Sequence, residues 1–384
     1  MKRLNSIFKM DKKNRHQILL WLIGGLILTF ATEIFLRGSI KEVVSWVKET
    51  PGVMLANYLL ILMLTSIFFL AKRKYMVYFI SFVVILGVSI TTFFLMKVRG
   101  TPLTFSDLYS IGEAMEIADK YINPTIIIIG IVCIAFLVVF CVFLYKLDGD
   151  TKRFKLINFV LVFVVSAVFF TTVKSQQAKN IMVYKRWDIP ASYKCNGLTY
   201  STVESCLKYI RTKPNDYSQS KIAKIKEKVD KAEANDNRKL NKNKPNVLFV
   251  QLEAFMDPET IKGVKYSEDP IPNFRKLTKL YTSGMANVPT TGGGTVRTEF
   301  EVMTGNNIDY LTPGEIPYST ILKSKYYNSV ATTLSSQGYE THAVHNFQGN
   351  FYGRNNAYGK LGFGDFTSQE YMSGYELNER NWIK

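Results

Sequence analysis

Five long apolar stretches near the N-terminus constrain the fold of this chain more than any other feature. Each is long enough to cross a bilayer, which takes about 20 apolar residues. They are Ile18–Leu36, Val53–Ala71, Tyr75–Met96, Pro124–Tyr145 and Leu156–Val173. Four contain no charged side chain, and the first carries only Glu33 near its end. A single stretch could be a buried helix of a soluble protein, but five in succession predict a domain of five transmembrane helices.

The loops between these stretches predict an orientation. The first stretch is predicted to be a retained anchor, because it follows 17 largely polar residues and lacks a small-residue cleavage site. Lysine and arginine are concentrated in 2–15, 72–74 and 146–155, all on one side, which is therefore cytoplasmic. Since the number of spans is odd, everything after Lys174 is predicted to be extracellular, and the protein is placed in the cell membrane.

The net charge and the cysteines say less about function. Part of the formal charge of +17 comes from the basic residues of the predicted cytoplasmic segments. The remaining positive charge would lie outside, beside an anionic lipid leaflet. An exported domain argues against nucleic acid as a partner. Cys133 and Cys141 lie within an apolar stretch and are predicted to be packing residues. Cys195 and Cys206 lie eleven residues apart and could form a disulfide or stay free thiols, and their spacing does not suggest a metal site.

The chain is predicted to contain three regions: a transmembrane domain at 1–174, an extracellular connecting region at 175–245 and a globular domain at 246–384. Residues 99–123, between the third and fourth spans, have the spacing of a helix on the membrane surface, or form an ordered loop. Ser218–Ala234, in the connecting region, is a highly charged helical run with Ile222, Ile225 and Val229 on one stripe.

The globular region alternates predicted strands and helices, which indicates an α/β sandwich. The predicted strands are Val247–Leu252, Met285–Pro289 and Glu340–His345, and the predicted helices are Pro272–Ser283, Val296–Met303 and Tyr326–Gln337. Glu253 and His345 come at the carboxyl ends of two of these strands, where α/β sheets gather ligands and catalytic groups.

Thr295 follows three glycines, Gly292 to Gly294, at the start of a predicted helix. A glycine turn before a helix lets an anion approach the free amides of the first turn. The same pattern also occurs in ordinary loops that cap a helix.

The order of motifs resembles a known family. Gln251-Leu252-Glu253, then Gly-Gly-Thr295 before a helix, then His345 and Phe351-Tyr352-Gly353-Arg354 resemble the lipoteichoic-acid synthase type of membrane-anchored, sulfatase-like phosphoglycerol transferase. The five apolar stretches and the RGTPLTFSDL loop look like that family too. The resemblance implies an extracellular domain of the sulfatase and alkaline phosphatase fold.

The resemblance also implies roles for individual residues. Thr295 would be the nucleophile, with Glu253 and Thr295 as ligands of a divalent cation, Mn²⁺ or Mg²⁺. His345, Arg354 and Tyr352, at a position where the family often has tryptophan, would contact the phosphoglycerol group. A threonine hydroxyl is a weak nucleophile that needs such activation, and hard cations prefer oxygen ligands. Arg297 and Glu299 are interpreted as structural residues of the first helical turn.

Two departures from the family pattern stand out. Phe347 lies where the family often has an acidic residue. The late Asp-His pair of the family's metal site is absent, since the only histidines are His16, His342 and His345. We therefore expect this chain to be a C-terminally truncated fragment of a longer enzyme.

The leading functional prediction is transfer of glycerol phosphate from phosphatidylglycerol, through Thr295, to a glycolipid or polyglycerolphosphate acceptor in lipoteichoic-acid-type polymer synthesis. The alternatives are a phosphoethanolamine transferase or another sulfatase-like phosphoesterase, and a non-catalytic envelope protein. A formylglycine-dependent sulfatase is not favoured, because Thr295 is neither Cys nor Ser.

Overall fold

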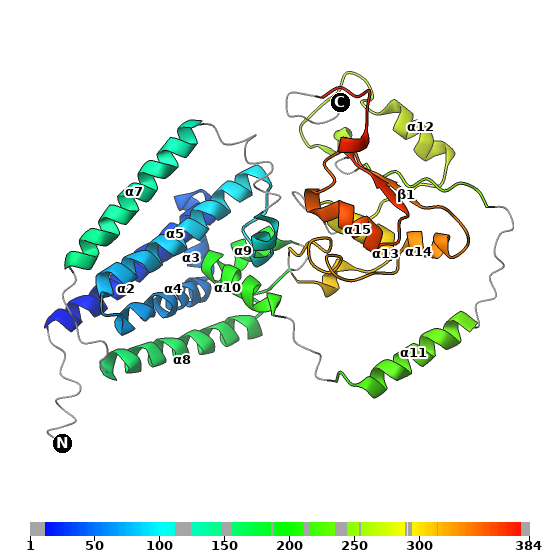
Figure 1. Ribbon diagram of the computed structural model, residues 1–384. Helices are drawn as coiled ribbons and strands as arrows, with labels where there is room; N and C mark the ends of the chain where they lie inside the picture. Colours follow the sequence, from blue (N-terminus) through cyan, green and yellow to red (C-terminus); the bar gives the residue numbers. More distant parts are fainter. Residues whose placement is uncertain are drawn as a thin grey trace. The chain divides into compact units, whose positions relative to one another are not determined.

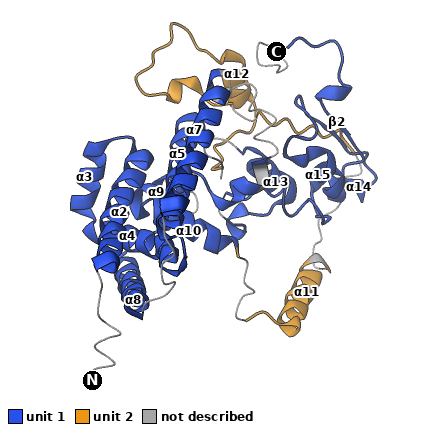
Figure 2. Ribbon diagram, turned by 60° about the vertical axis from the view of Figure 1, so that its left-hand side comes forward, with its two compact units in different colours: residues 1–209, 289–384 blue, residues 210–288 orange. Residues whose placement is uncertain are grey.

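The computed structural model describes residues 12–111, 124–147, 156–185, 188–210, 216–234, 244–252, 255–288, 290, 294–312 and 314–377. By packing, the chain divides into two compact units. One comprises residues 1–209 and 289–384, and the other comprises residues 210–288 (Figure 2). The predicted domain boundaries after residues 174 and 245 stay a prediction.

Five helices among the described residues are long and apolar enough to cross a membrane, which confirms the five predicted stretches as helices. They are α2 (Lys12–Arg37), α4 (Pro51–Thr65) with its continuation η1 (Ser66–Leu70), α5 (Lys74–Val98), α7 (Pro124–Leu147) and α8 (Leu156–Ala178) (Figure 1). A helix satisfies its backbone hydrogen bonds within one segment, as a bilayer requires.

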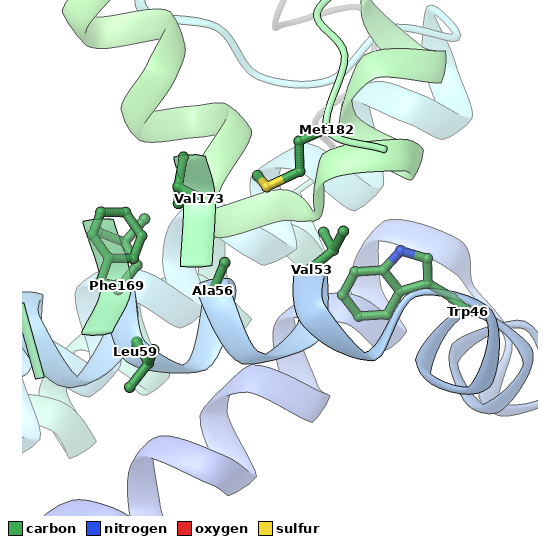
Figure 3. Packing of buried hydrophobic residues seen from close by; sticks show 8 residues of the cluster. Trp46, Val53, Ala56, Leu59, Phe169, Val173 and Met182 are labelled. Carbon is green, nitrogen blue, oxygen red and sulfur yellow. The ribbon is translucent and has the colours of Figure 1, made fainter. Parts of the chain in front are cut away.

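The largest buried cluster of the membrane helices lies between α4 and α8, beside α3 (Ile40–Glu49). Its buried members are Trp46, Val53, Ala56, Leu59, Leu60, Phe169, Val173 and Met182 (Figure 3). Lipid tails are as apolar as these side chains, so close packing, rather than the hydrophobic effect, holds membrane helices together. The small side chain of Ala56 suits such a close approach.

Two short helices that follow the spans are fixed to them by buried polar contacts. They are α9 (Ile189–Asn196) and α10 (Leu198–Tyr209). The buried carboxylate of Glu33 in α2 forms an ion pair with Arg37 and accepts a hydrogen bond from the Leu198 amide at 2.8 Å. Asn57 in α4 donates to the Asn196 carbonyl at 2.8 Å and accepts from the Tyr200 amide at 3.0 Å. Residues 189–209 therefore pack as part of the membrane-helix assembly.

The described C-terminal part is built from short helices around one two-stranded parallel sheet. The helices are α13 (Val296–Thr304), α14 (Val330–Ser335) and α15 (Arg354–Lys360), with the 3₁₀ turns η4 (Ile308–Tyr310), η5 (Phe351–Gly353) and η6 (Gln369–Tyr371). Strand β1 (His342–Val344) pairs with β2 (Asp365–Thr367). The helices and strands of this part surround one buried core, which is made of Val296, Phe300, Tyr318, Leu322, Ala343, Ala357, Tyr358 and Leu361.

The unit of residues 210–288 contains α11 (Gln219–Ala234), η3 (Pro258–Thr260) and α12 (Pro272–Leu280). The prediction of a strand at Val247–Leu252 is wrong for this structure, because these residues form no strand and Leu248 is 86% exposed. Residues 285–288 form no strand either. The physical reason is that an extended segment becomes a strand only by hydrogen bonding to a neighbouring strand, and no described strand pairs with these segments.

Other predicted elements differ in length or type in the structure. The helix predicted at Tyr326–Gln337 is shorter in the structure, where it is α14. Its start is fixed by Ser329, whose hydroxyl accepts a hydrogen bond from the Ala331 amide at 2.9 Å and so caps the helix. Residues 105–110 form the 3₁₀ turn η2 (Phe105–Ser110), and 112–123 lie outside the described residues. Cys195 and Cys206 are free thiols.

We predict that the β1–β2 pairing weakens as the pH rises. His342 Nδ1 lies 2.6 Å from Asp365 Oδ2 across the register of β1 and β2, and this carboxylate, with a smaller contribution from Glu340, raises the pKa of the exposed His342. A group whose pKa is raised in the folded state contributes its full stabilisation of the fold below its unfolded-state pKa, which is about 6.5 for histidine. This contribution is lost as the pH rises through the folded-state pKa. The melting temperature of the unsubstituted protein should therefore exceed that of His342→Asn at about pH 5.5 and match it at about pH 8.5. A difference that grows with pH would contradict this assignment.

Candidate functional site

Thr295 lies at the N-terminal end of α13, and its hydroxyl forms no hydrogen bond with the described residues. Gly294 has φ +77°, and a Cβ there would lie 3.1 Å from Arg297 Nη2, so the turn before Thr295 requires glycine. The carbonyl of Thr295 accepts the Glu299 amide at 3.1 Å and so starts the helix. Its side chain makes no capping hydrogen bond and is partly exposed. Within the described part of the chain, this hydroxyl is therefore available to a ligand.

One turn further along α13, Glu299 belongs to a buried polar network. Glu299 Oε2 accepts from Arg354 Nη2 at 3.2 Å, and Oε1 accepts from the Tyr358 hydroxyl. The side chain of Arg354 is only 1% exposed. Burial raises the pKa of Tyr358, and the nearby Glu299 carboxylate raises it further, so Tyr358 stays a hydrogen-bond donor. The network ties α13 to α15, and the interpretation of Glu299 as structural agrees with this geometry.

Tyr352 occupies an unusual backbone conformation directly before α15. Its φ is +58°, which is strained for a side chain with a Cβ, and Gly353 follows in the same left-handed region with φ +66°. Strain of this kind costs about 1–3 kcal/mol and is concentrated at functional sites. The guanidinium of Arg354 lies 5.3 Å from the centroid of the Tyr352 ring. Two predicted substrate residues, Tyr352 and Arg354, are therefore in contact with each other.

His345 is linked to Tyr352 through a hydrogen bond with Phe347 and two aromatic contacts. It follows the last residue of β1, as predicted, and its Nδ1 accepts a hydrogen bond from the Phe347 amide at 3.1 Å, so a neutral ring carries its proton on Nε2. The Phe347 ring packs edge-on against Phe351 at 5.1 Å between centroids, and Phe351 packs against Tyr352 at 4.3 Å. Phe347 thus has a packing role at the position where the family pattern often has an acid.

The loop after α5 packs against Gly314 in the C-terminal part of the chain. Arg99 donates two hydrogen bonds of 2.7 and 2.8 Å to the Asp107 carboxylate. Asp107 Oδ2 also accepts a hydrogen bond from the Thr104 amide at 2.6 Å. Gly314 has φ +73°, and a Cβ there would lie 2.6 Å from Ser106 Oγ and 2.8 Å from Thr104 Oγ1. This loop therefore meets a glycine that tolerates no side chain.

Arg297, two residues after Thr295, contacts the same glycine. Its Nη2 donates to the Gly314 carbonyl at 3.4 Å. Burial lowers the pKa of Arg297, while Tyr352 and Asp107 act in the opposite direction and Arg99 adds to the lowering. No sequence pattern connects Arg297 with Arg99 and Asp107. The capping-box spacing of Thr104 and Asp107 marks the turn itself, but no local signal indicates its contact with Gly314.

The predicted metal site is not formed by the described residues. No group of three or more His, Cys, Asp or Glu side chains among them could hold a metal ion. Glu253, Gly292 and Gly293 lie outside the described residues. The described donors around Thr295 do not fit a metal ion by themselves.

Comparison with known proteins identifies the domain in this part of the chain. Residues 245–383 match the family model described as Sulfatase. Five apolar helices followed by a sulfatase domain agree with the predicted fold class. No solved structure gave a significant match to the chain.

One curated relative is similar over about half of the chain. It is the "Putative cyclic beta-1,2-glucan modification protein" of Rhizobium meliloti (strain 1021), which is 32% identical over 186 residues. The match covers 48% of this chain and 28% of the relative. The chain therefore matches less than a third of the relative's length.

We predict that Glu299→Gln destabilises the C-terminal part, because it removes the carboxylate that pairs with the buried guanidinium of Arg354. Removing one partner of a buried ion pair costs about 3–5 kcal/mol. The measurement is thermal unfolding of the purified protein in detergent. The matched control is Glu340→Gln, since the Glu340 side chain is 92% exposed. Equal melting temperatures for the two variants would show that the Glu299–Arg354 pair does not hold α13 to α15.

Proposed function

We propose that this chain is part of a membrane-anchored transferase that moves glycerol phosphate from phosphatidylglycerol to an acceptor through Thr295. The observation that carries the proposal is the partly exposed Thr295 at a helix N-terminus in the region that matches the sulfatase model, where its hydroxyl forms no hydrogen bond with the described residues. The five apolar helices support a membrane-bound enzyme, which suits a lipid donor. We further propose that the sulfatase domain is extracellular and that the acceptor is a glycolipid or polyglycerolphosphate.

The proposed reaction has two displacements at phosphorus. Thr295 Oγ1 attacks the phosphodiester, the bond from phosphorus to the diacylglycerol oxygen breaks, and the proton of the threonine hydroxyl is delivered to that oxygen. The chain then carries glycerol phosphate on Thr295. An acceptor hydroxyl attacks the same phosphorus, passes its proton to Thr295 and restores the free hydroxyl. Free amides at the start of α13 would favour the anionic phosphoryl group.

Three further residues are proposed to contact the phosphoglycerol group. His345 would donate from Nε2, because its Nδ1 accepts the Phe347 amide. Tyr352 is proposed as a contact to glycerol, and its strained backbone supports a constrained role. Of the three proposed substrate contacts, Arg354 has the least support from the structure, because its guanidinium already pairs with Glu299. A divalent cation, Mn²⁺ or Mg²⁺, with Glu253 and Thr295 as ligands, stays a prediction from the sequence.

A second candidate function is transfer of a phosphoryl group to a glucan. The specific observation in its favour is the similarity to a protein whose name describes cyclic beta-1,2-glucan modification. The chemistry at Thr295 would be the same, and only the acceptor would differ. A phosphoethanolamine donor is the corresponding alternative on the donor side.

We predict that the full-length protein, reconstituted in phosphatidylglycerol vesicles with Mn²⁺, releases diacylglycerol and that Thr295→Ala lowers the rate at least about a thousandfold. Removal of a nucleophile has effects of this size or larger. The measurement is release of labelled diacylglycerol. Parallel reactions with phosphatidylethanolamine as donor, and with polyglycerolphosphate or cyclic glucan as acceptor, distinguish the candidates.

The matched control is Thr304→Ala, at the other end of the same helix. Its hydroxyl donates to the Phe300 carbonyl at 2.6 Å and accepts the Asn306 amide at 3.2 Å, so this variant tests damage to α13 alone. Full activity in Thr295→Ala would refute the threonine mechanism. No release from any donor by the full-length protein would favour the non-catalytic alternative.

A further inference from the structure

Helix α11 carries an exposed apolar stripe that the proposed reaction does not use. Ile222, Ile225 and Val229 recur at the spacing of one helical face. They are 46%, 49% and 51% exposed. Aliphatic side chains aligned in this way are typical of a helix that buries one face against another surface.

Lysines border this stripe. The helix contains five lysines, against the acidic residues Glu227, Asp230 and Glu233. At about 100° per residue, Lys221 and Lys228 lie along one side of the stripe and Lys226 along the other, while Glu227 lies on the opposite face. Glu233, in the last turn, is the acidic position nearest to the stripe.

Three of these lysines have no carboxylate partner among the described residues. Lys221 pairs with Asp216, and Lys231 pairs with Glu227 at 2.7 Å. Lys224, Lys226 and Lys228 form no ion pair within the described part of the chain. The sequence after the helix, residues 235–245, adds four basic residues and one acidic residue. The helix thus combines an apolar stripe with uncompensated positive charge.

We propose that α11 lies on the surface of an anionic lipid bilayer, with its apolar stripe at the boundary between headgroups and acyl chains and its lysines toward the lipid phosphates. A basic amphipathic helix is a typical membrane-surface element. Charge complementarity selects an anionic surface, since lysines near such a surface are attracted to it. The inference needs the membrane helices but not the reaction at Thr295.

The chain itself keeps α11 within reach of a bilayer. Nine residues separate the end of α10 at Tyr209 from the start of α11 at Gln219. An extended chain of this length spans at most roughly 35 Å. Helix α10 packs with the membrane helices, so the lipid surface is present at high effective concentration. A soluble partner would lack this advantage.

The test is hydrogen–deuterium exchange of the unmodified full-length protein in lipid nanodiscs. One set of discs contains phosphatidylcholine alone, and the other contains phosphatidylcholine with phosphatidylserine, which is anionic but is not the proposed donor. We expect amide exchange in the α11 peptide to slow roughly tenfold or more in the anionic discs. We also expect about 1 M salt, where the Debye length falls to about 3 Å, to remove most of the difference.

Charge variants make the test specific. Lys224→Gln, Lys226→Gln and Lys228→Gln together should abolish the effect of phosphatidylserine. The matched control changes three exposed lysines of the same unit outside α11, Lys262, Lys265 and Lys276, and should retain it. Equal exchange in both kinds of disc would overturn the proposal. Protection that depends on protein concentration rather than on lipid charge would also overturn it and would identify a second copy as the occupant.

Discussion

The geometry around Thr295 depends on the buried carboxylate of Glu299, one helical turn further along α13. A charge removed from water must be paired and hydrogen-bonded, or its desolvation is uncompensated. Glu299 meets this requirement through Arg354 and Tyr358 of α15. The pair therefore helps to set how α13 lies against α15. The buried core of the C-terminal part surrounds this network and excludes water from it.

A second constraint links the membrane helices to the sulfatase domain. Arg99 and Asp107 hydrogen-bond to each other in the loop after α5, and Tyr193 of α9 donates to the Leu103 carbonyl of the same loop at 2.8 Å. This loop meets Gly314, whose carbonyl accepts from Arg297. A continuous series of contacts thus runs from the membrane helices to the residue two positions after Thr295. The proposed reaction with a lipid donor would need Thr295 held at a fixed place relative to the membrane, and such contacts would provide a physical means.

The sequence was most informative where structure depends on local chemistry. Long charge-free stretches specify membrane helices by composition alone, and the glycine turn before Thr295 is a local signal. The burial of Glu299 could not be predicted, because a glutamate in a first helical turn is usually a solvated residue that favours the helix dipole. The run Val247–Leu252 has the composition of a buried strand, but a strand also needs a partner that composition does not specify. The contact of Gly314 with the loop after α5 joins positions far apart in the chain, and no local pattern encodes it.

The central claim is that Thr295 carries the transferred group, and peptide mass spectrometry tests it most directly. The full-length protein is quenched in acid during turnover of phosphatidylglycerol and digested, and the peptide that contains Thr295 is examined for added mass. We predict a glycerol phosphate group on the Thr295 side chain. Diacylglycerol release with Thr295 unmodified, or with the group on another residue, would contradict the proposed mechanism.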